Sequence, residues 1–171
     1  MSQKTNSRRP FIWLFERPVR LPVHSYIGDL FAEEAPAEGL SYGLSDFSMK
    51  VQGIDRTLVD KVFAICDYVL KGKVRRHSRH IYDIYKLLPL VSLDDEFGGL
   101  IREVRAVRAE TNICPSAQPE VNVTALLQKI ISEDLYKADY NQLSVKLLEE
   151  SVSYEQAITA IRAIADSGIF G

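Results

Sequence analysis

The sequence lacks long hydrophobic runs and contains only 2 cysteines in 171 residues. No apolar stretch approaches the ~18–20 residues that a membrane span needs. The first residues, MSQKTNSRRP, are polar and precede no apolar region of the kind found in secretory signals. Cys66 and Cys114 form no CxxC pair, which argues against a cysteine-based zinc site and indicates a reducing compartment. We therefore expect a cytoplasmic protein without a membrane segment.

An excess of charge of one sign is also absent. The net charge of −2 at pH 7 argues neither for nor against binding to nucleic acid. Hydrophobic residues make up 46% and charged residues 26% of the chain, which is the balance of an ordinary globular protein. This composition excludes a disordered, collagen-like or disulfide-rich chain, and the length suits a single compact domain. It says nothing about chemistry.

Common catalytic motifs are missing as well. The sequence has no GxGxxG loop, no GxxxxGK(S/T) loop and no paired carboxylates of the DxD type. Ser78 follows His77, but no acyl-transfer motif surrounds it. His77, His80 and Asp83 carry metal-ligand atoms, but the spacing of His80 and Asp83 recurs often by chance. We therefore predict no metal ligand in the chain.

Strand signals are confined to the first third of the sequence. Phe11–Glu16 is a short apolar and aromatic run, and Phe47–Val51 alternates apolar and polar residues. Both patterns predict strands. Pro18 and Pro22 each remove an amide donor, which excludes a central strand at their positions.

The segments that follow are less regular at first and then helical. Val23–Phe31 is ambiguous between a strand and a short helix, and Glu33–Gly43, with its proline and two glycines, predicts a loop. Beyond it, apolar residues recur with the period of amphipathic helices. The predicted helices cover residues 57–71, 78–88, 94–108, 123–131, 140–149 and 154–169.

Local signals mark the ends of the first long helix. Thr57 followed by Asp60 resembles a capping box, with Asp55 as the competing N-cap residue. Gly72 is a natural stop after the helix. With these boundaries, the sequence predicts an α+β fold. A few N-terminal strands within residues 1–54 precede a mainly α-helical bundle of residues 55–171, all in one compact domain.

The most distinctive segment is the turn between the first two predicted helices, residues 71–80. Five of its ten residues are Lys or Arg, and one interpretation is a solvated basic turn. The other is a phosphate site, because residues Ser78 to His80 would lie at a helix N-terminus. Free amides and the helix dipole attract anions there, and Arg79 adds a forked donor.

Lys61 and Asp83 are the charged residues that packing alone does not explain. Lys61 lies near the edge of an apolar helix face, and Asp83 lies between Ile81 and Ile84, where a carboxylate disfavours helix and is costly to bury. If the two helices pack antiparallel, Lys61 and Asp83 can meet. Alternatively, Lys61 is exposed and Asp83 pairs with Arg79, four residues earlier.

A polar stripe on the third predicted helix consists of Arg102, Arg105 and Arg108, spaced three residues apart. Such a stripe is most often solvated or paired with acidic helices, and less often faces RNA. The spacing does not distinguish these alternatives.

Three segments resemble a known protein family. They are TLVDKVFAICDYVLKGKVRRHSRHIYDIYKLL (57–88), REVRAVRAETNICPSAQP (102–119) and DLYKADY (134–140). They resemble the AbiEii/AbiGii nucleotidyltransferase toxins of type IV toxin–antitoxin systems. The resemblance implies a nucleotidyltransferase-like fold whose N-terminal strands are the remnant of a larger sheet. It also implies transfer of a nucleotide from a nucleoside triphosphate (NTP) to an acceptor such as RNA, with Mg²⁺ as cofactor and a cognate antitoxin as partner.

The resemblance assigns roles to residues of the first two helices. The family's lysine corresponds to Lys61, which is expected to hold triphosphate oxygens. The aspartate of the R-x-x-Y-D pattern corresponds to Asp83, which is expected to orient Lys61 or the nucleotide, and Arg79 is the matching arginine. Ser78 and Arg76, beside the predicted helix N-terminus, complete the expected substrate-binding residues. Where many relatives have an aspartate after the arginine, this chain has a histidine.

Two family motifs have no counterpart in the sequence. A Gly-Ser or Gly-Gly loop that holds phosphate and a paired-carboxylate motif that holds metal belong to the family's N-terminal half. Because carboxylate-bound metal ions stabilise the leaving pyrophosphate, we expect this chain to be the C-terminal part of such an enzyme and inactive alone. Its Mg²⁺ ligands would lie in a separate N-terminal half, unless the chain is a truncated product.

Other functions stay open at this point. The helical bundle can act as a non-catalytic interaction module that binds an antitoxin, a partner half-protein or RNA. A basic RNA-binding domain without enzymatic ancestry is a third hypothesis. The remnant sheet would expose an edge that favours pairing with another chain, so we expect a homodimer or association with an N-terminal half.

Overall fold

The computed structural model describes residues 19–144 and 151–171. It divides the chain into two compact units, one that ends at Gly53 and one that begins at Ile54. The predicted strand at Phe11–Glu16 lies outside the described residues. The expectation that the whole chain behaves as one domain stays a prediction.

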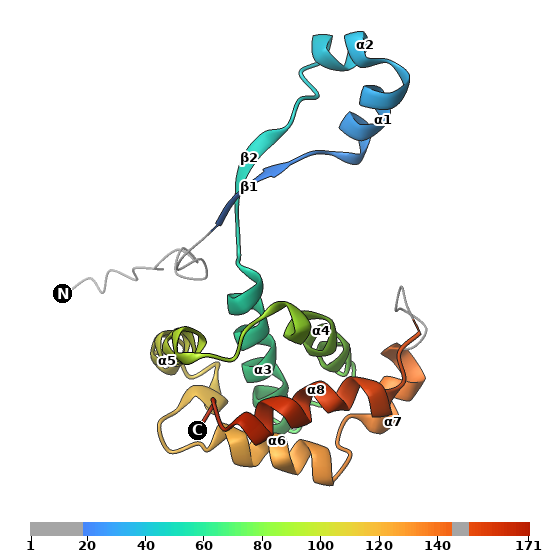
Figure 1. The fold of residues 1–171 in the computed structure, drawn as a ribbon. Coiled ribbons are helices and arrows are strands. Elements are labelled where there is room, and N and C mark those ends of the chain that lie inside the picture. Colours follow the sequence, from blue (N-terminus) through green and yellow to red (C-terminus); the bar gives the residue numbers. More distant parts are fainter. Residues whose placement is uncertain (1–18, 145–150) are drawn as a thin grey trace, which may run out of the picture. The chain divides into compact units, whose positions relative to one another are not determined.

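The first unit contains the sheet of the described chain. Strand β1 (Val19–Val23) pairs antiparallel with β2 (Phe47–Val51), with Val19 opposite Val51. Helices α1 (Tyr26–Glu34) and α2 (Pro36–Ser41) connect the two strands (Figure 1). The predicted strand at Phe47–Val51 is therefore confirmed, and its partner is a segment that the sequence pattern did not identify as a strand.

Local backbone chemistry explains the other differences in this unit. Pro22 lies within β1, and it is tolerated because both strands of a two-stranded sheet are edges. Most of the ambiguous segment Val23–Phe31 forms α1, which begins where Ser25 Oγ accepts a backbone N–H of the first turn at 2.9 Å. The predicted loop at Glu33–Gly43 is wrong in its centre. Pro36 occupies the first position of α2, where its fixed φ and missing N–H favour a helix.

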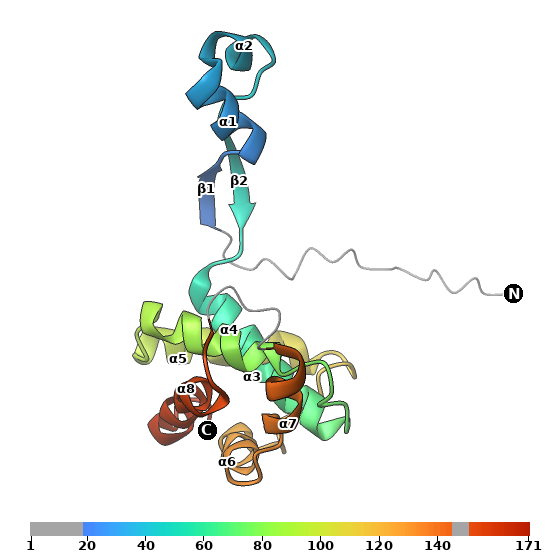
Figure 2. The same ribbon diagram turned by 90° about the vertical axis from the view of Figure 1, so that its right-hand side faces the viewer.

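The described part of the second unit is helical (Figures 1 and 2). Its elements are α3 (Ile54–Leu70), α4 (Arg79–Leu87), η2 (Leu88–Leu90), α5 (Asp95–Ala109), η3 (Pro115–Ala117), α6 (Val123–Ser132), α7 (Lys137–Asp139), η4 (Tyr140–Ser144) and α8 (Tyr154–Ser167). Helix α3 packs against α4, α5 and α6, and α8 packs against α4 and α6. The predicted α+β, mainly helical fold is confirmed. None of the helices within residues 19–144 and 151–171 is both long and apolar enough to cross a membrane.

The helix ends test the predicted boundaries. Helix α3 begins at Ile54, so Asp55 and Thr57 both lie inside the helix and the predicted capping box is wrong. An acidic side chain in the first turn still interacts favourably with the helix dipole. Gly72 follows α3 with a φ of 64°, the left-handed conformation expected of a glycine after a helix. Of the predicted helix at residues 140–149, the described part is the short π-helix η4, and the rest lies outside the described residues.

The core of the second unit forms around α3. Its side chains Leu58, Val62, Phe63 and Cys66 are fully buried. They belong to one core cluster with residues of the surrounding helices, including Ile81, Ile84, Leu127, Ile130, Ile161 and Ile164. Complete burial of such a side chain contributes roughly 1.5–3 kcal/mol. This packing holds α3 and α4 together and positions the polar residues at their edge.

Candidate functional site

Lys61 and Asp83 connect α3 to α4. Lys61 Nζ donates a hydrogen bond to Asp83 Oδ2 at 2.6 Å. The two side chains are 29% and 31% exposed, so the charged groups lie at the surface end of the contact between the helices. Of the two arrangements that the sequence left open, the structure has the contact between helices. Within the described ranges, Asp83 is bound by Lys61 and His80 rather than by Arg79.

His80 is the third member of this cluster. Its Nδ1 atom lies 3.4 Å from Lys61 Nζ and 3.5 Å from Asp83 Oδ2, and the residue is 8% exposed. Burial opposes ionisation of Asp83, but hydrogen bonds from His80 and Lys61 outweigh it, so the pKa of Asp83 lies below its usual value. The ionised carboxylate therefore fixes both neighbours. The sequence indicated His80 as a weak metal-ligand candidate and as part of a helix N-terminus, and its i, i+3 spacing to Asp83 was a usable signal for the contact.

Two further rings, those of Tyr68 and His77, stack beside the His80 ring of this cluster. Tyr68 stacks on His77 with ring centroids 3.5 Å apart and planes 11° apart, and His80 lies nearly parallel to both rings. His77 Nδ1 is buried and makes no hydrogen bond to a described residue. Burial, with smaller contributions from His80 and Arg79, lowers the pKa of His77, against an opposing effect of Asp139. The His77 ring is therefore held mainly by stacking.

The basic turn (residues 71–80) has a fixed backbone. Arg76 has a φ of 68°, a conformation that L-residues rarely adopt. Asp139 of α7 accepts the Arg76 amide at 2.9 Å and the Ser78 amide at 3.2 Å, and it also bonds to the Ser78 hydroxyl. Burial opposes ionisation of Asp139, but these hydrogen bonds outweigh it and lower its pKa. Of the amides that the sequence suggested for phosphate, that of Ser78 binds a carboxylate and that of His80 donates to the His77 carbonyl at 3.2 Å.

The charged side chains of the basic turn are more exposed than Ser78. Lys73, Arg75, Arg76 and Arg79 are exposed, whereas Ser78 is 1% exposed. In the part of the chain that the structure describes, Lys73, Arg76 and Arg79 form no ion pair with a carboxylate. Arg79 opens α4 one turn before Asp83, so both lie on the same side of that helix. Arg79 is therefore one helical turn from Asp83 on α4, Arg76 lies in the turn and Ser78 is buried.

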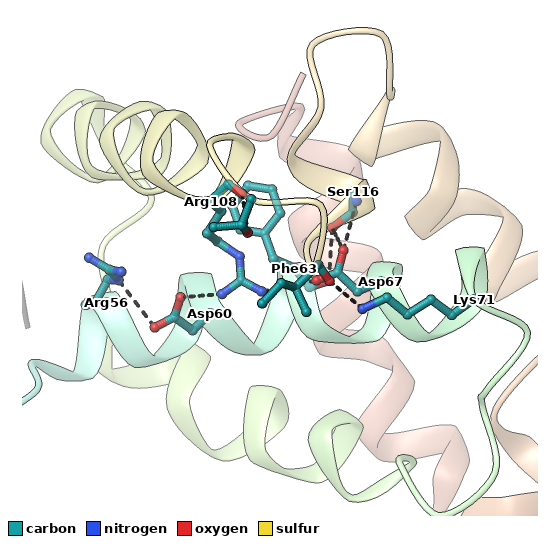
Figure 3. Close-up of polar contacts among 9 residues, drawn as sticks. Arg56, Asp60, Phe63, Asp67, Lys71, Arg108 and Ser116 are labelled. Carbon is teal, nitrogen blue, oxygen red and sulfur yellow. Dashed lines mark hydrogen bonds and ion pairs between the residues drawn. The ribbon is translucent and has the colours of Figure 1, made fainter. Parts of the chain in front are cut away.

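A second polar network joins another side of α3 to α5 and η3 (Figure 3). Arg108 donates to Asp60 at 2.9 Å and to Asp67 at 3.1 Å, and its guanidinium lies 5.4 Å from the centre of the Phe63 ring. Asp67 also accepts the Ser116 amide at 2.8 Å and the Ser116 hydroxyl at 2.6 Å. This network is largely buried, so it fixes the position of α3 relative to its neighbours.

The arginine stripe of α5 is mainly structural. Arg105 donates to three backbone carbonyls, those of Ala117, Gln118 and Val121. Arg108 pairs with the acidic residues of α3, which is one of the alternatives that the spacing allowed. Arg102 alone is exposed. Neither Arg105 nor Arg108 therefore offers its charge to an RNA backbone.

The carboxylates of the described chain do not fit Mg²⁺. Asp60 and Asp67 are both paired with Arg108, and Asp83 is paired with Lys61. No group of three or more His, Cys, Asp or Glu residues among residues 19–144 and 151–171 is placed to hold a metal ion. Hard cations require several oxygen ligands that are not already committed to cations.

Comparison with known proteins agrees with the resemblance of the two helices. A family model described as nucleotidyl transferase AbiEii toxin, type IV toxin–antitoxin system, matches residues 11–164. No curated protein and no solved structure matches the chain. The matched region includes α3, α4 and the basic turn, and it spans most of the sequence. The chain therefore belongs to the AbiEii nucleotidyl transferase toxin family of type IV toxin–antitoxin systems.

Proposed function

We propose that the Lys61–Asp83 pair, together with Arg79, binds the triphosphate of an NTP. The observation that carries this proposal is the 2.6 Å contact between two partly exposed side chains on different helices. A lysine ammonium has three N–H donors. Lys61 uses one of them on Asp83, and His80 Nδ1 lies 3.4 Å from the same ammonium. The remaining donor can reach a ligand at the surface, and the fixed ammonium loses little freedom when it binds phosphate.

Each residue has a distinct part in this proposal. Lys61 supplies a point charge for triphosphate oxygens, and Arg79 supplies a planar fork that suits phosphate geometry. Asp83 orients Lys61, since its carboxylate would repel phosphate if it contacted it directly. Ser78 is buried and supports the first turn of α4 through Asp139. The exposed guanidinium of Arg76 adds positive charge.

We also propose that this chain corresponds to the C-terminal part of an AbiEii nucleotidyltransferase and transfers no nucleotide by itself. The proposal rests on the absence of a DxD-type motif from the sequence and on the family's need for a carboxylate-bound metal at the leaving pyrophosphate. A separate N-terminal half would supply the Mg²⁺ ligands, and RNA would be the acceptor. An antitoxin is the partner that the type IV family implies.

Equilibrium binding tests the nucleotide site. The purified chain is titrated with each of the four NTPs, and the Lys61→Ala, Asp83→Ala and Lys129→Ala variants are compared. Loss of a charge-assisted hydrogen bond of about 1.5–3 kcal/mol predicts roughly 10- to 100-fold weaker binding for Lys61→Ala. Asp83→Ala should weaken binding as well, because Lys61 is no longer oriented. Lys129 is an exposed lysine of α6, so Lys129→Ala serves as the matched control.

Two outcomes would contradict the proposal. No NTP binding by the wild-type chain would favour the non-catalytic interaction module. Unchanged binding in Lys61→Ala would place the nucleotide elsewhere.

Inactivity of the isolated chain is tested by incubating it with RNA and radiolabelled NTP. Label on the RNA that disappears in Lys61→Ala would show that the chain is active alone.

A further inference from the structure

We infer that the first half of the basic turn, through Lys71, Lys73 and Arg75, binds the phosphate backbone of the acceptor RNA. This inference rests on the proposed function, because it takes the Lys61–Asp83 pair as the nucleotide site. It adds a second surface with a separate task. Arg76 and Arg79 bind the triphosphate. Lys71, Lys73 and Arg75 bind the acceptor RNA.

The backbone of this surface is pre-organised. The Lys73 amide donates to the Tyr68 carbonyl at 2.8 Å, and Gly72 adopts a φ of 64°. At the other end, Asp139 holds the Arg76 amide at 2.9 Å. Between these points Val74 packs against the core, while its neighbours Lys73 and Arg75 are exposed. A ligand therefore meets cations on a fixed backbone, and little conformational entropy is lost on binding.

The charge of this surface is largely uncompensated. Lys73 has no carboxylate within ion-pair distance in the described ranges. Lys71 Nζ donates to the backbone carbonyl of Ile113 at 2.5 Å, which ties the turn to a neighbouring loop and leaves the lysine its full charge. Arg75 is close enough to Asp139 to help lower the pKa of that carboxyl. That carboxylate also accepts the backbone amides of the turn, so it offsets the cations only in part.

The chemistry of the turn favours RNA over an acidic protein segment. Protein interfaces have an apolar centre, often aromatic, with charge at the rim. Here the one aliphatic side chain of the turn, Val74, packs against the core, and the His77 ring stacks on Tyr68. What the first half of the turn exposes is a row of cations. A row of cations is sufficient to bind a nucleic acid backbone without sequence preference, because release of the counterions of the nucleic acid supplies most of the binding free energy.

The position of the turn also suits an acceptor. His80 Nδ1 lies 3.4 Å from Lys61 Nζ, and its ring centroid lies 6.3 Å from that of His77 within the same turn. The end of the basic turn at His77 and His80 is therefore adjacent to the proposed triphosphate site. An RNA strand held by Lys73 and Arg75 would reach the nucleotide by extending past these two histidines.

Fluorescence anisotropy with a labelled single-stranded RNA tests this inference. For the wild-type chain, three phosphate contacts predict a slope of about −2 in a plot of log K against log salt concentration. The Lys73→Gln/Arg75→Gln variant should bind about 10-fold or more weakly, and its slope should fall in magnitude by roughly 1.4. The matched control is Lys129→Gln/Arg162→Gln, which removes the same charge from exposed positions on α6 and α8. It should bind RNA like the wild type.

Several results would overturn the inference. They are an equal loss in the control, an unchanged salt slope in the turn variant, or no RNA binding by the wild type. Displacement of the RNA by a polyglutamate peptide of equal charge would instead identify an acidic protein as the partner. NTP binding by the same variants separates this inference from the proposed function. If Lys73→Gln/Arg75→Gln has normal affinity for both NTP and RNA, the nucleotide site stands and the RNA surface is wrong.

Discussion

Lys61 and Asp83 are 22 residues apart in the sequence, yet their side chains form a 2.6 Å hydrogen-bonded ion pair between α3 and α4. The pair is partly exposed, and ion pairs with access to water contribute roughly 0–1 kcal/mol to stability. The core beneath it, which includes Val62 and Ile84, is fully buried. We therefore expect the pair to contribute little to folding, which is consistent with the proposed role in binding.

A double-mutant cycle should show this small contribution to stability. Lys61→Ala, Asp83→Ala and the double variant are unfolded with urea. The coupling free energy between Lys61 and Asp83 is expected to be about 1 kcal/mol or less. A coupling of about 3 kcal/mol or more would identify the pair as a structural ion pair and weaken the case for a nucleotide site.

The ionisation of Asp83 should be visible in the pH dependence of stability. Burial opposes ionisation, but His80 and Lys61 together lower the pKa of Asp83 below its usual value of 3.8. The stabilisation from the ionised carboxylate is therefore fully present above about pH 4 and is lost as the pH falls through the lower folded pKa. The difference in unfolding free energy between wild type and Asp83→Asn should be constant at higher pH and shrink below about pH 4. A difference that stays constant in acid would contradict this assignment.

His77 should make the protein less stable as the solution is acidified. Burial, His80 and Arg79 lower the pKa of His77 from its usual value of 6.5. Below that value the unfolded chain takes up a proton that the folded chain does not, so stability falls as the pH decreases. His77→Phe keeps a ring against Tyr68 and cannot titrate. The melting temperature of this variant should therefore fall less than that of the wild type as the pH decreases. His24→Gln should lose stability in acid as the wild type does. The pKa of the exposed His24 is raised by Asp29, so His24 is not the source of this loss.

Asp67 should be among the most sensitive polar residues of the second unit. It is 4% exposed and accepts hydrogen bonds from Arg108 and from the amide and hydroxyl of Ser116. Asp67→Ala leaves these donors unpaired and is expected to lower the free energy of unfolding by about 3–5 kcal/mol. Asp166→Ala, at an exposed position of α8, should stay within about 0.5 kcal/mol of the wild type. Equal effects of the two variants in urea unfolding would refute this role.

The fold was predictable where a local pattern decides the structure. Helices α3, α4, α5, α6 and α8 follow the period of their apolar residues, since an amphipathic helix needs only one buried face. Strand β1 and helix α2 were missed because each is short and contains a proline. A proline is tolerated in a strand at the edge of a sheet and in the first turn of a helix. A periodic pattern of apolar residues indicates neither position.

For the candidate site, the sequence indicated which residues to consider but not most of their contacts. The family pattern pointed to Lys61, Asp83 and Arg79. It did not indicate that Asp139 would accept the Ser78 amide from 61 residues away. Nor did it indicate that Arg105 would be used by backbone carbonyls instead of by solvent or RNA. These contacts join residues far apart in the sequence, so no local spacing encodes them.

The sequence by itself determined the main helices, the concentration of cations between residues 71 and 80, and the lack of a DxD-type motif. Composition and the period of apolar residues are sufficient to identify these features, because each feature depends only on residues close together in the sequence. Only the tertiary structure decided that Asp83 pairs with Lys61 and not with Arg79, and that the amides of the basic turn are held by Asp139. Those choices depend on how α3, α4 and α7 pack. Packing selects among several electrostatically equivalent partners by bringing only some of them within reach.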